Sequence, residues 1–269
     1  MGALDSLLCD GVDDYVALDG GDLNTNIDAY SMLVVMKRGS DSTFDGVCYG
    51  GASGAGAKVG FGIEPSSDNI LCDTADVGQC ATAGAGSKSN TITSLVANGW
   101  CVLGYTKPAG ATAIPRMHKY NYGTTTWSHE AGSELMNNVA ANLDTFYAGA
   151  WMDSIGNPSD FFIGNLGLAA FWLSNLGSDG AVESTVSNLL SMNSWIAAGP
   201  DELIRFNTMS AISATVGNMQ EFTRNGTTLD VGDMPAGWTE GADVPGPATN
   251  IDFSNFPRFL RSGRKIKYA

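Results

Sequence analysis

The stretch from Phe161 to Trp195 limits the fold most strongly, because its hydrophobic period changes once and sharply. Residues 161–173 are apolar except at Gly164, Asn165 and Gly167. Such runs are typical of strands that are buried on both faces, and the Gly-Asn-x-Gly interruption favours a tight turn between two of them. We therefore expect two buried strands in this segment.

The second half of this stretch has the period of a helix. Its apolar residues lie close to positions i, i+4, i+7 and i+8, and they are Val182, Val186, Leu189, Leu190 and Trp195. Ser178 or Asp179 can cap the start, and Gly199-Pro200 closes the connection. The sequence thus predicts one short helix over residues 179–195, directly after the buried strands.

The composition is that of an all-β protein. Of the 269 residues 43% are hydrophobic, which is enough to bury a large core, and only 16% are charged. The 34 glycines, with many Asn, Ser, Thr and Asp residues, are typical of short strands joined by turns. We expect one main domain, with the nearly apolar run at residues 31–37 as a central strand covered on both faces.

The charge is unevenly distributed along the chain. The net charge is −14, but the last twelve residues hold five basic side chains and no acidic one, so residues 1–257 carry −19. Such an acidic body repels phosphate backbones, which argues against nucleic acid as a partner.

The N-terminus lacks a basic start and a long apolar core, and no run approaches the roughly 20 apolar residues that cross a bilayer. We expect neither secretion nor membrane insertion.

The cysteines do not form a complete disulfide set, because their number is odd. They are Cys9, Cys48, Cys72, Cys80 and Cys101, and no two of them have the C-x-x-C spacing of zinc or redox sites. We interpret them mainly as buried free thiols. A bridge between Cys72 and Cys80 is the alternative in an oxidising compartment.

A first hairpin is predicted at residues 7–18, LLCDGVDDYVAL, where two apolar ends flank a polar centre. Turn formation is the simplest role for Asp10, Asp13 and Asp14. Clustered carboxylates are also calcium ligands, so these three are the candidate metal site, although the EF-hand order of ligands is absent. No other cofactor is expected.

A second hairpin, around Gly123-Thr124, is the most distinctive candidate surface. Residues two apart on a strand share one face. The residues concerned are His118, Tyr120 and Tyr122 on one strand and Trp127 and His129 on the other. If the register brings the two sets together, they form an aromatic platform of the kind that stacks on sugar rings. The alternative is packing in the core or between subunits.

Five segments resemble, in order, the signature segments of LamG-like, concanavalin A-like jelly rolls. They span about residues 7–207 and are LCDGVDDYV, SMLVVMK, GWCVLGYT, FYAGAW and DFFIGNLGLAAFWLSNLGSDGAV. The resemblance implies a two-sheet antiparallel jelly-roll sandwich that begins with an edge hairpin. It also implies that the Gly-x-Leu-Ala strand closes the sandwich and that a short helix follows a Leu-Ser turn, here Leu173-Ser174.

Residues 191–238 are similar to the segment that comes after this jelly roll in minor tail proteins of bacteriophages. In those proteins a tryptophan, a Pro-x-x-Leu strand and a Gly-Thr-Thr strand recur, here Trp195, residues 200–203 and residues 226–228. The similarity implies a structural virion protein, made in the host cytoplasm and placed on the particle exterior. Its implied partners are other virion proteins, further copies of itself and host-surface glycans. A free-standing carbohydrate-binding lectin is the first alternative, and a glycanase is the second.

Catalysis is not expected from the motifs. Laminarinase-type glycanases place their nucleophile and general acid on one strand as E-x-D-x-x-E, and this motif is absent from the sequence. His129, Glu130 and Glu134 lack the second histidine of a zinc protease. The chain has two histidines, and no Gly-x-Ser-x-Gly elbow surrounds any serine, so a serine hydrolase triad is not indicated.

The composition shifts after Trp238, which divides the chain into three parts. We predict a jelly roll at 1–207, accessory strands packed on it at 208–240, and a linker with an extended basic docking tail at 241–269. The tail mixes apolar and basic side chains, as segments that order on a partner do. The predicted docking residues are Phe253, Phe256, Arg258, Phe259, Leu260, Arg261, Arg264, Lys265, Ile266, Lys267 and Tyr268.

Overall fold

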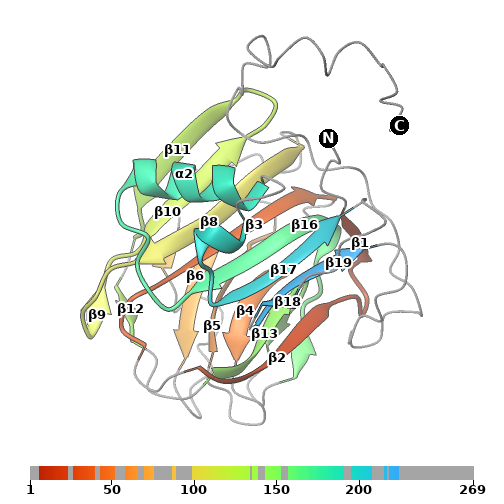
Figure 1. Ribbon diagram of the computed structural model, residues 1–269, viewed down its shortest axis with the longest axis horizontal. Helices are drawn as coiled ribbons and strands as arrows, with labels where there is room; N and C mark the ends of the chain where they lie inside the picture. Colours follow the sequence, from red (N-terminus) through yellow and green to blue (C-terminus); the bar gives the residue numbers. More distant parts are fainter. Residues whose placement is uncertain are drawn as a thin grey trace, which may run out of the picture.

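Within the part of the chain that it describes, the computed structural model is built around two stacked β-sheets, with one α-helix over the outer face of the larger sheet (Figure 1). The structure describes residues 6–23, 27–39, 43–51, 58–65, 70–75, 87–88, 99–133, 135–138, 143–152, 157–190, 195–207, 215–216 and 218–223. The predicted all-β, two-sheet antiparallel sandwich with one short helix is confirmed. The predicted tail lies outside the described residues.

The larger sheet has nine strands within the described part of the chain, in the order β11-β10-β8-β3-β16-β17-β19-β18, with β1 beside β16. Their bounds are β1 Leu7–Asp10, β3 Tyr30–Arg38, β8 Trp100–Lys107, β10 Arg116–Asn121, β11 Thr126–Ala131, β16 Ile163–Trp172, β17 Glu202–Asn207, β18 Thr215–Val216 and β19 Asn218–Thr223. Neighbouring strands are antiparallel except β17 and β19, which are parallel.

The smaller sheet has the order β2-β13-β4-β5-β6-β7 among the described residues. Its strands are β2 Val16–Leu23, β13 Leu143–Ala148, β4 Asp45–Gly51, β5 Lys58–Ile63, β6 Ile70–Ala75 and β7 Ser87–Lys88. Two short ribbons join β9 Thr112–Ala113 to β12 Met136–Asn137 and β14 Trp151–Met152 to β15 Pro158–Ser159. The helix α2 covers Asp179–Leu190, and a 3-10 turn, η1, covers Ile196–Ala198.

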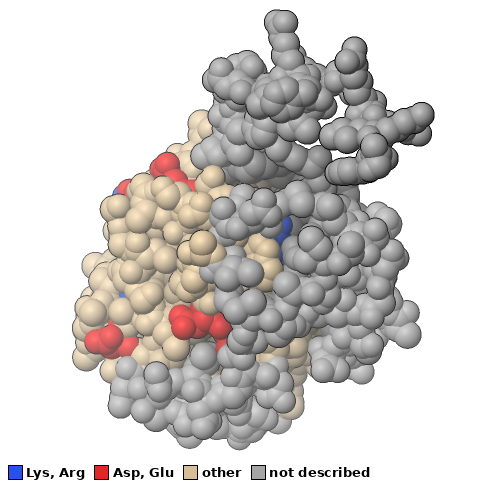
Figure 2. Space-filling model, in the orientation of Figure 1, with Lys and Arg blue, Asp and Glu red and all other residues tan. Residues whose placement is uncertain are grey.

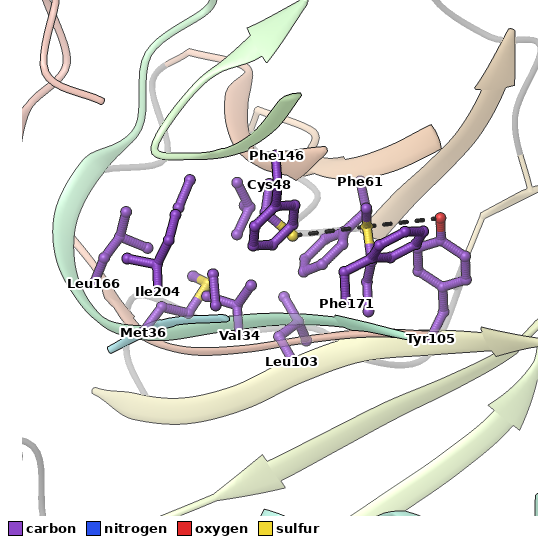
Figure 3. Close-up of a cluster of buried hydrophobic side chains, with 14 of the residues drawn as sticks. Val34, Met36, Cys48, Phe61, Leu103, Tyr105, Phe146, Leu166, Phe171 and Ile204 are labelled. Carbon is purple, nitrogen blue, oxygen red and sulfur yellow. Dashed lines mark hydrogen bonds between the residues drawn. The ribbon is translucent and has the colours of Figure 1, made fainter. Parts of the chain in front are cut away.

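The central strand β3 contributes side chains to two hydrophobic cores, one on each face of the sheet, which explains its nearly continuous apolar sequence. Met32, Val34 and Met36 point into the space between the sheets. Leu33 and Val35 point to the other side, toward α2. Figure 3 shows the core between the sheets, where side chains of the larger sheet such as Phe171 meet Phe61 and Phe146 of the smaller one. The predicted central strand is therefore confirmed.

The second core lies between the outer face of the larger sheet and α2. Val182, Val186 and Leu189 of the helix pack there against Trp172, whose indole Nε1 donates a hydrogen bond to the carbonyl of Ala198 at 3.1 Å. Ser178 caps the helix, since its carbonyl accepts from the backbone N–H groups of residues 181 and 182. The helix ends at Leu190, so the predicted end at 195 is wrong, although Trp195 is buried in the same cluster.

The segment 161–173 forms one strand, β16, and the predicted turn within it is wrong. Gly164 has φ of +140°, and a Cβ there would lie 2.2 Å from the carbonyl oxygen of Lys37 on β3. Because it has no side chain, this glycine allows the backbone of β3 to lie close to β16, and it does not form a turn. A register shift between Leu166 and Leu168 moves these side chains to opposite faces of the sheet.

The predicted hairpin at residues 7–18 is also wrong, because β1 and β2 belong to different sheets. β1 pairs with β16, and β2 pairs with β13. Hydrogen bonds from backbone to side chain stabilise the segment that connects the two strands. Asp10 Oδ1 accepts from the N–H of Val12 at 2.8 Å, and Asp14 Oδ2 accepts from the N–H of Asp10 at 3.0 Å. Gly11 has φ of +84°, which favours glycine. The apolar ends of this segment thus mark two strands but not their partners.

Four cysteines, Cys9, Cys48, Cys72 and Cys101, are buried. Cys72 Sγ lies 3.3 Å from the thioether sulfur of Met117. Cys80 lies outside the described residues, so a bridge between Cys72 and Cys80 stays a prediction.

Over the described residues, we find no helix with the length and apolar character needed to span a membrane.

Candidate functional site on the second hairpin

The five side chains predicted to form an aromatic platform meet on one face of the β10–β11 hairpin. The register pairs His118 with His129 and Tyr120 with Trp127, so the two sets come together as predicted. The turn between the strands covers residues 122–125, and Asn121 Oδ1 accepts from the N–H of Gly123 at 2.8 Å. We call His118, Tyr120, Tyr122, Trp127 and His129 the hairpin cluster.

Helix α2 covers part of this face (Figure 1). His118 is fully buried, and Tyr120 is 3% exposed, so neither forms a surface for a sugar ring. The alternative of packing therefore holds for these two residues. Tyr122, Trp127 and His129 are only partly buried, and β11 is an edge strand among the described strands. The accessible part of the hairpin cluster thus consists of these three residues.

The rings of the hairpin cluster are arranged in a row. Trp127 and His129 are stacked, with an interplanar angle of 7° and centroids 5.4 Å apart. Tyr120 lies against Trp127 at 5.2 Å and meets the edge of Tyr122 at 5.0 Å. The hydroxyl of Tyr122 is buried without a hydrogen-bond partner among the described residues, and burial raises its pKa well above the usual range. The row is therefore held in place by ring packing.

A chain of hydrogen bonds runs through the two histidines. His118 Nε2 lies 3.1 Å from Thr106 Oγ1, His118 Nδ1 lies 2.8 Å from His129 Nδ1, and His129 Nε2 lies 3.1 Å from Glu183 Oε1. Burial first, and His129 second, lower the pKa of His118 to about 3, so this ring is neutral at neutral pH. With both rings neutral, the Thr106 hydroxyl donates to His118, His118 donates to His129, and His129 donates to Glu183.

A bidentate ion pair ties the start of α2 to β10. Arg116 Nε and Nη2 donate to Asp179 Oδ1 and Oδ2 at 2.5 and 2.6 Å. The hydrogen bond from Arg116 lowers the pKa of Asp179, and the same bond raises the pKa of Arg116. Asp179 Oδ1 also lies 3.7 Å from His129 Nδ1. Helix and hairpin therefore form one polar cluster above the second core.

The sequence interpretation missed Arg116, Asp179 and Glu183 as members of this site. A signal was present for the last two, since they lie four residues apart in the predicted helix and so share one of its faces. Nothing in the local sequence pattern indicated that this helix would cover the second hairpin, some 60 residues earlier in the chain.

Two groups of side chains bring metal-ligating atoms together within the described residues. One ligand atom from each of His118, His129 and Asp179 lies within 4.8 Å of the others. The same holds for Asp10, Asp13 and Asp14, the predicted calcium ligands. Asp10 and Asp14 already accept backbone hydrogen bonds in the turn, and calcium binding at these three stays a prediction.

The predicted docking residues between Phe253 and Tyr268 lie outside the described residues. Their role in assembly therefore stays a prediction. The same applies to the division of the chain at residues 207 and 240, although β18 and β19 of the middle part do join the larger sheet beside β17.

Comparison with known proteins identifies similar folds only. No protein-family model matches the sequence, and no curated protein matches it. Domains LG4-5 of the mouse laminin alpha1 chain are 17% identical, with a TM-score of 0.40 over 63% of this chain and 41% of that one. The native heptameric SAP-like pentraxin of Limulus polyphemus is 14% identical, with a TM-score of 0.45 over 74% of this chain and 92% of that one.

A viral protein is among the similar structures as well. Full-length tailspike protein 2 of an Escherichia coli O157:H7 bacteriophage is 10% identical, with a TM-score of 0.38 over 65% of this chain and 23% of that one. This chain therefore corresponds to less than half of the laminin and tailspike chains. Because each TM-score is below 0.5, the three structures indicate nothing about the function of this protein.

Proposed function

We propose that this protein is a non-catalytic exterior component of a bacteriophage particle and that its sandwich binds host-surface glycans through the β10–β11 hairpin. The observation that carries the binding proposal is the partly exposed row of Tyr122, Trp127 and His129 at the edge of the larger sheet. Aromatic rings that are fixed by their neighbours lose little conformational freedom when a sugar stacks on them.

The surroundings of the row disfavour a negatively charged ligand. Figure 2, in the view of Figure 1, shows mostly uncharged atoms, several groups of acidic atoms and few basic ones on the described part of this face. Arg116, the basic side chain of the site, is already paired with Asp179. Neutral sugar rings, which offer C–H faces to aromatic rings and hydroxyls to His129 and Glu183, suit this surface better than phosphorylated ligands.

The same contacts argue against a glycanase, the second alternative. A glycanase needs a carboxylic acid whose pKa is raised so that it can protonate the leaving group. The pKa of Asp179 is lowered by its hydrogen bond from Arg116, which is the opposite of that requirement. Glu183 Oε1 lies at hydrogen-bond distance from His129 Nε2. These contacts support a binding role for the site.

The virion part of the proposal rests on the sequence similarity of residues 191–238 to phage minor tail proteins and on the basic, apolar tail. Further copies of this chain or other virion proteins are its proposed partners. A free-standing lectin would bind the same sugars without being part of particles. Co-purification with particles in a fixed copy number therefore distinguishes the two.

The binding role is tested with Trp127→Ala. The purified protein is screened on an array of bacterial surface oligosaccharides, and the best ligand is titrated by NMR. We expect the substitution to weaken binding about tenfold, because a stacked aromatic ring contributes up to about 1.5 kcal/mol beyond the area that it buries. Leu135→Ala is the control, since Leu135 is 59% exposed and is not part of the hairpin cluster. Binding that survives Trp127→Ala unchanged, or a complete lack of sugar binding by the parent, would overturn the role of this hairpin.

A further inference from the structure

Two imidazoles and a carboxylate converge between the β10–β11 hairpin and the first turn of α2. We propose that His118, His129 and Asp179 bind one divalent transition-metal ion, with Zn²⁺ as the reference ion. Their ligand atoms lie within 4.8 Å of one another and come from three different elements. A bound ion would therefore link both strands of the hairpin to the helix.

The positions of the hydrogen-bond partners around both rings match those found around metal-binding histidines. Such histidines almost always use one ring nitrogen for the metal and donate a hydrogen bond with the other. Here the Nε2 atoms of His118 and His129 lie 3.1 Å from Thr106 Oγ1 and Glu183 Oε1, while their Nδ1 atoms face each other at 2.8 Å. The two Nδ1 atoms are thus the ones left for an ion, and the two oxygens act as outer partners.

Binding requires one proton to move within the site. In the ion-free pair, one Nδ1 carries the proton that it shares with the other Nδ1. When the ion binds, that proton of His118 moves to Nε2 and is donated to Thr106 Oγ1, whose hydroxyl group rotates to accept it. His129 keeps its proton on Nε2, facing Glu183. Both rings remain neutral, and both Nδ1 lone pairs point to the ion.

The distances require only a small movement. With Zn–N bonds of about 2.0–2.1 Å and tetrahedral angles, two nitrogen ligands lie about 3.3 Å apart. The present Nδ1 to Nδ1 distance is 2.8 Å, so the rings need to separate by about half an ångström. His129 lies on an edge strand and its side chain is 12% exposed, which leaves it room to shift.

The third ligand and the charge of the site suit a divalent ion of this class. Asp179 Oδ1 lies 3.7 Å from His129 Nδ1, and although Arg116 binds this carboxylate, each oxygen has a second lone pair. With neutral histidines, Asp179 and Glu183 outweigh Arg116 by one negative charge. Two imidazoles and one carboxylate favour Zn²⁺ and its transition-metal neighbours over Ca²⁺ or Mg²⁺. Solvent reaches Asp179, which is 33% exposed, so water can supply a fourth ligand.

This inference does not rest on sugar binding, and its experiment contains no sugar. Protein without an affinity tag is treated with a chelator, dialysed and titrated with Zn²⁺ in competition with a chromophoric chelator. Co²⁺ is added in parallel, because its visible absorption reports tetrahedral coordination by the protein. We expect one Zn²⁺ per chain, and an excess of Ca²⁺ or Mg²⁺ should not displace it.

The variants avoid the buried ring, whose loss would disturb the fold. His129→Gln removes one ligand and should abolish stoichiometric Zn²⁺ binding and the Co²⁺ spectrum. Glu183→Gln keeps the ligands but removes an outer partner, and it should weaken Zn²⁺ binding about 10–100-fold. Ser184→Ala, at an exposed position on the same helix, is the control and should leave the affinity unchanged. Lack of Zn²⁺ binding by the parent, or equal affinity in His129→Gln, would refute the site.

Discussion

At the scale of single residues, two ion pairs of this protein differ mainly in their solvent exposure. Arg38 Nε and Asp45 Oδ2 are 2.7 Å apart, and both side chains are 0% exposed. Arg116 Nε and Asp179 Oδ1 are 2.5 Å apart, but their side chains are 43% and 33% exposed. Removing one partner of a buried pair leaves the other charge without compensation, whereas water replaces a lost partner at the surface.

We therefore predict very different costs for the two pairs. Asp45→Asn should lower the free energy of unfolding by about 3–5 kcal/mol. Arg116→Gln, measured in chelator, should lower it by about 0–1 kcal/mol. Urea unfolding followed by circular dichroism gives both values. The double variant Arg38→Met/Asp45→Leu should recover part of the loss of Asp45→Asn, because it buries no charge. Equal costs for Asp45→Asn and Arg116→Gln would contradict this account.

Trp172 is the residue on which the second core depends most directly. It is 2% exposed, packs under α2 and donates a hydrogen bond to the carbonyl of Ala198. Trp172→Ala should lower the free energy of unfolding by about 3–5 kcal/mol, because it leaves a cavity that the sheet and helix fill only partly. Trp172→Phe is the matched control, since it keeps a ring and should cost less. A Trp172→Ala variant as stable as the parent would show that this core contributes little.

At the scale of elements, two glycines of the β16–α2 region should respond to alanine with opposite signs. A Cβ on Gly164 would lie 2.2 Å from the Lys37 oxygen, at a φ of +140° that alanine rarely adopts. Gly180, in the first turn of α2, has no atom within 4 Å of the corresponding position. Gly164→Ala should therefore destabilise by about 1–3 kcal/mol. Gly180→Ala should stabilise by about 0.4–1 kcal/mol. Thermal unfolding of the two variants checks both signs.

The elements also show which parts of the fold a sequence pattern predicts. Apolar period and capping residues are local, and they located β3, the β10–β11 hairpin and the start of α2. The choice of strand partner is not local. The apolar ends of residues 7–18 are typical of a hairpin. In the structure, however, β1 pairs with the first residues of β16 in the larger sheet, and β2 pairs with β13 in the smaller one. In the same way, Gly164 serves the approach of β3 and not a turn, which the segment alone does not indicate.

In the candidate site, too, the local features could be predicted from the sequence and the non-local contacts could not. The face shared by His118 and Tyr120, and its register with Trp127 and His129, follows from period two and a short turn. The covering of that face by α2 comes from packing of the helix on Trp172 and on Leu33 and Val102, and the last two are distant from the helix in sequence. For this reason the aromatic residues were predicted together, while the pattern left open which of them are buried and did not indicate the contributions of Arg116, Asp179 and Glu183.

At the scale of the whole molecule, charge and hydrophobicity together suggest how the chain joins an assembly. Residues 1–257 carry −19, and the last twelve carry five basic side chains. The opposite charges alone favour contact between the two parts, but exposed ion pairs contribute only about 0–1 kcal/mol each. Residues 250–269 also contain Phe253, Phe256, Phe259, Leu260, Ile266 and Tyr268. Burial of each large apolar side chain contributes about 1.5–3 kcal/mol, which a neighbouring chain with suitable pockets would supply.

We therefore predict that apolar burial on a partner, rather than charge, attaches this segment. Deleting residues 250–269 should leave a soluble, folded sandwich that no longer joins the particle, as measured by its copy number in purified virions. Two full-length variants separate the causes. Phe253→Ser/Phe256→Ser/Phe259→Ser should lose incorporation at any salt concentration, because it removes the apolar contacts. Replacing the five terminal basic residues with Gln should weaken incorporation only partly and remove its salt dependence, because exposed charges are screened over about 10 Å at 0.1 M salt. Normal incorporation of the truncated chain would instead place the attachment surface on the sandwich, where the exposed edge of β11 is the first region to test.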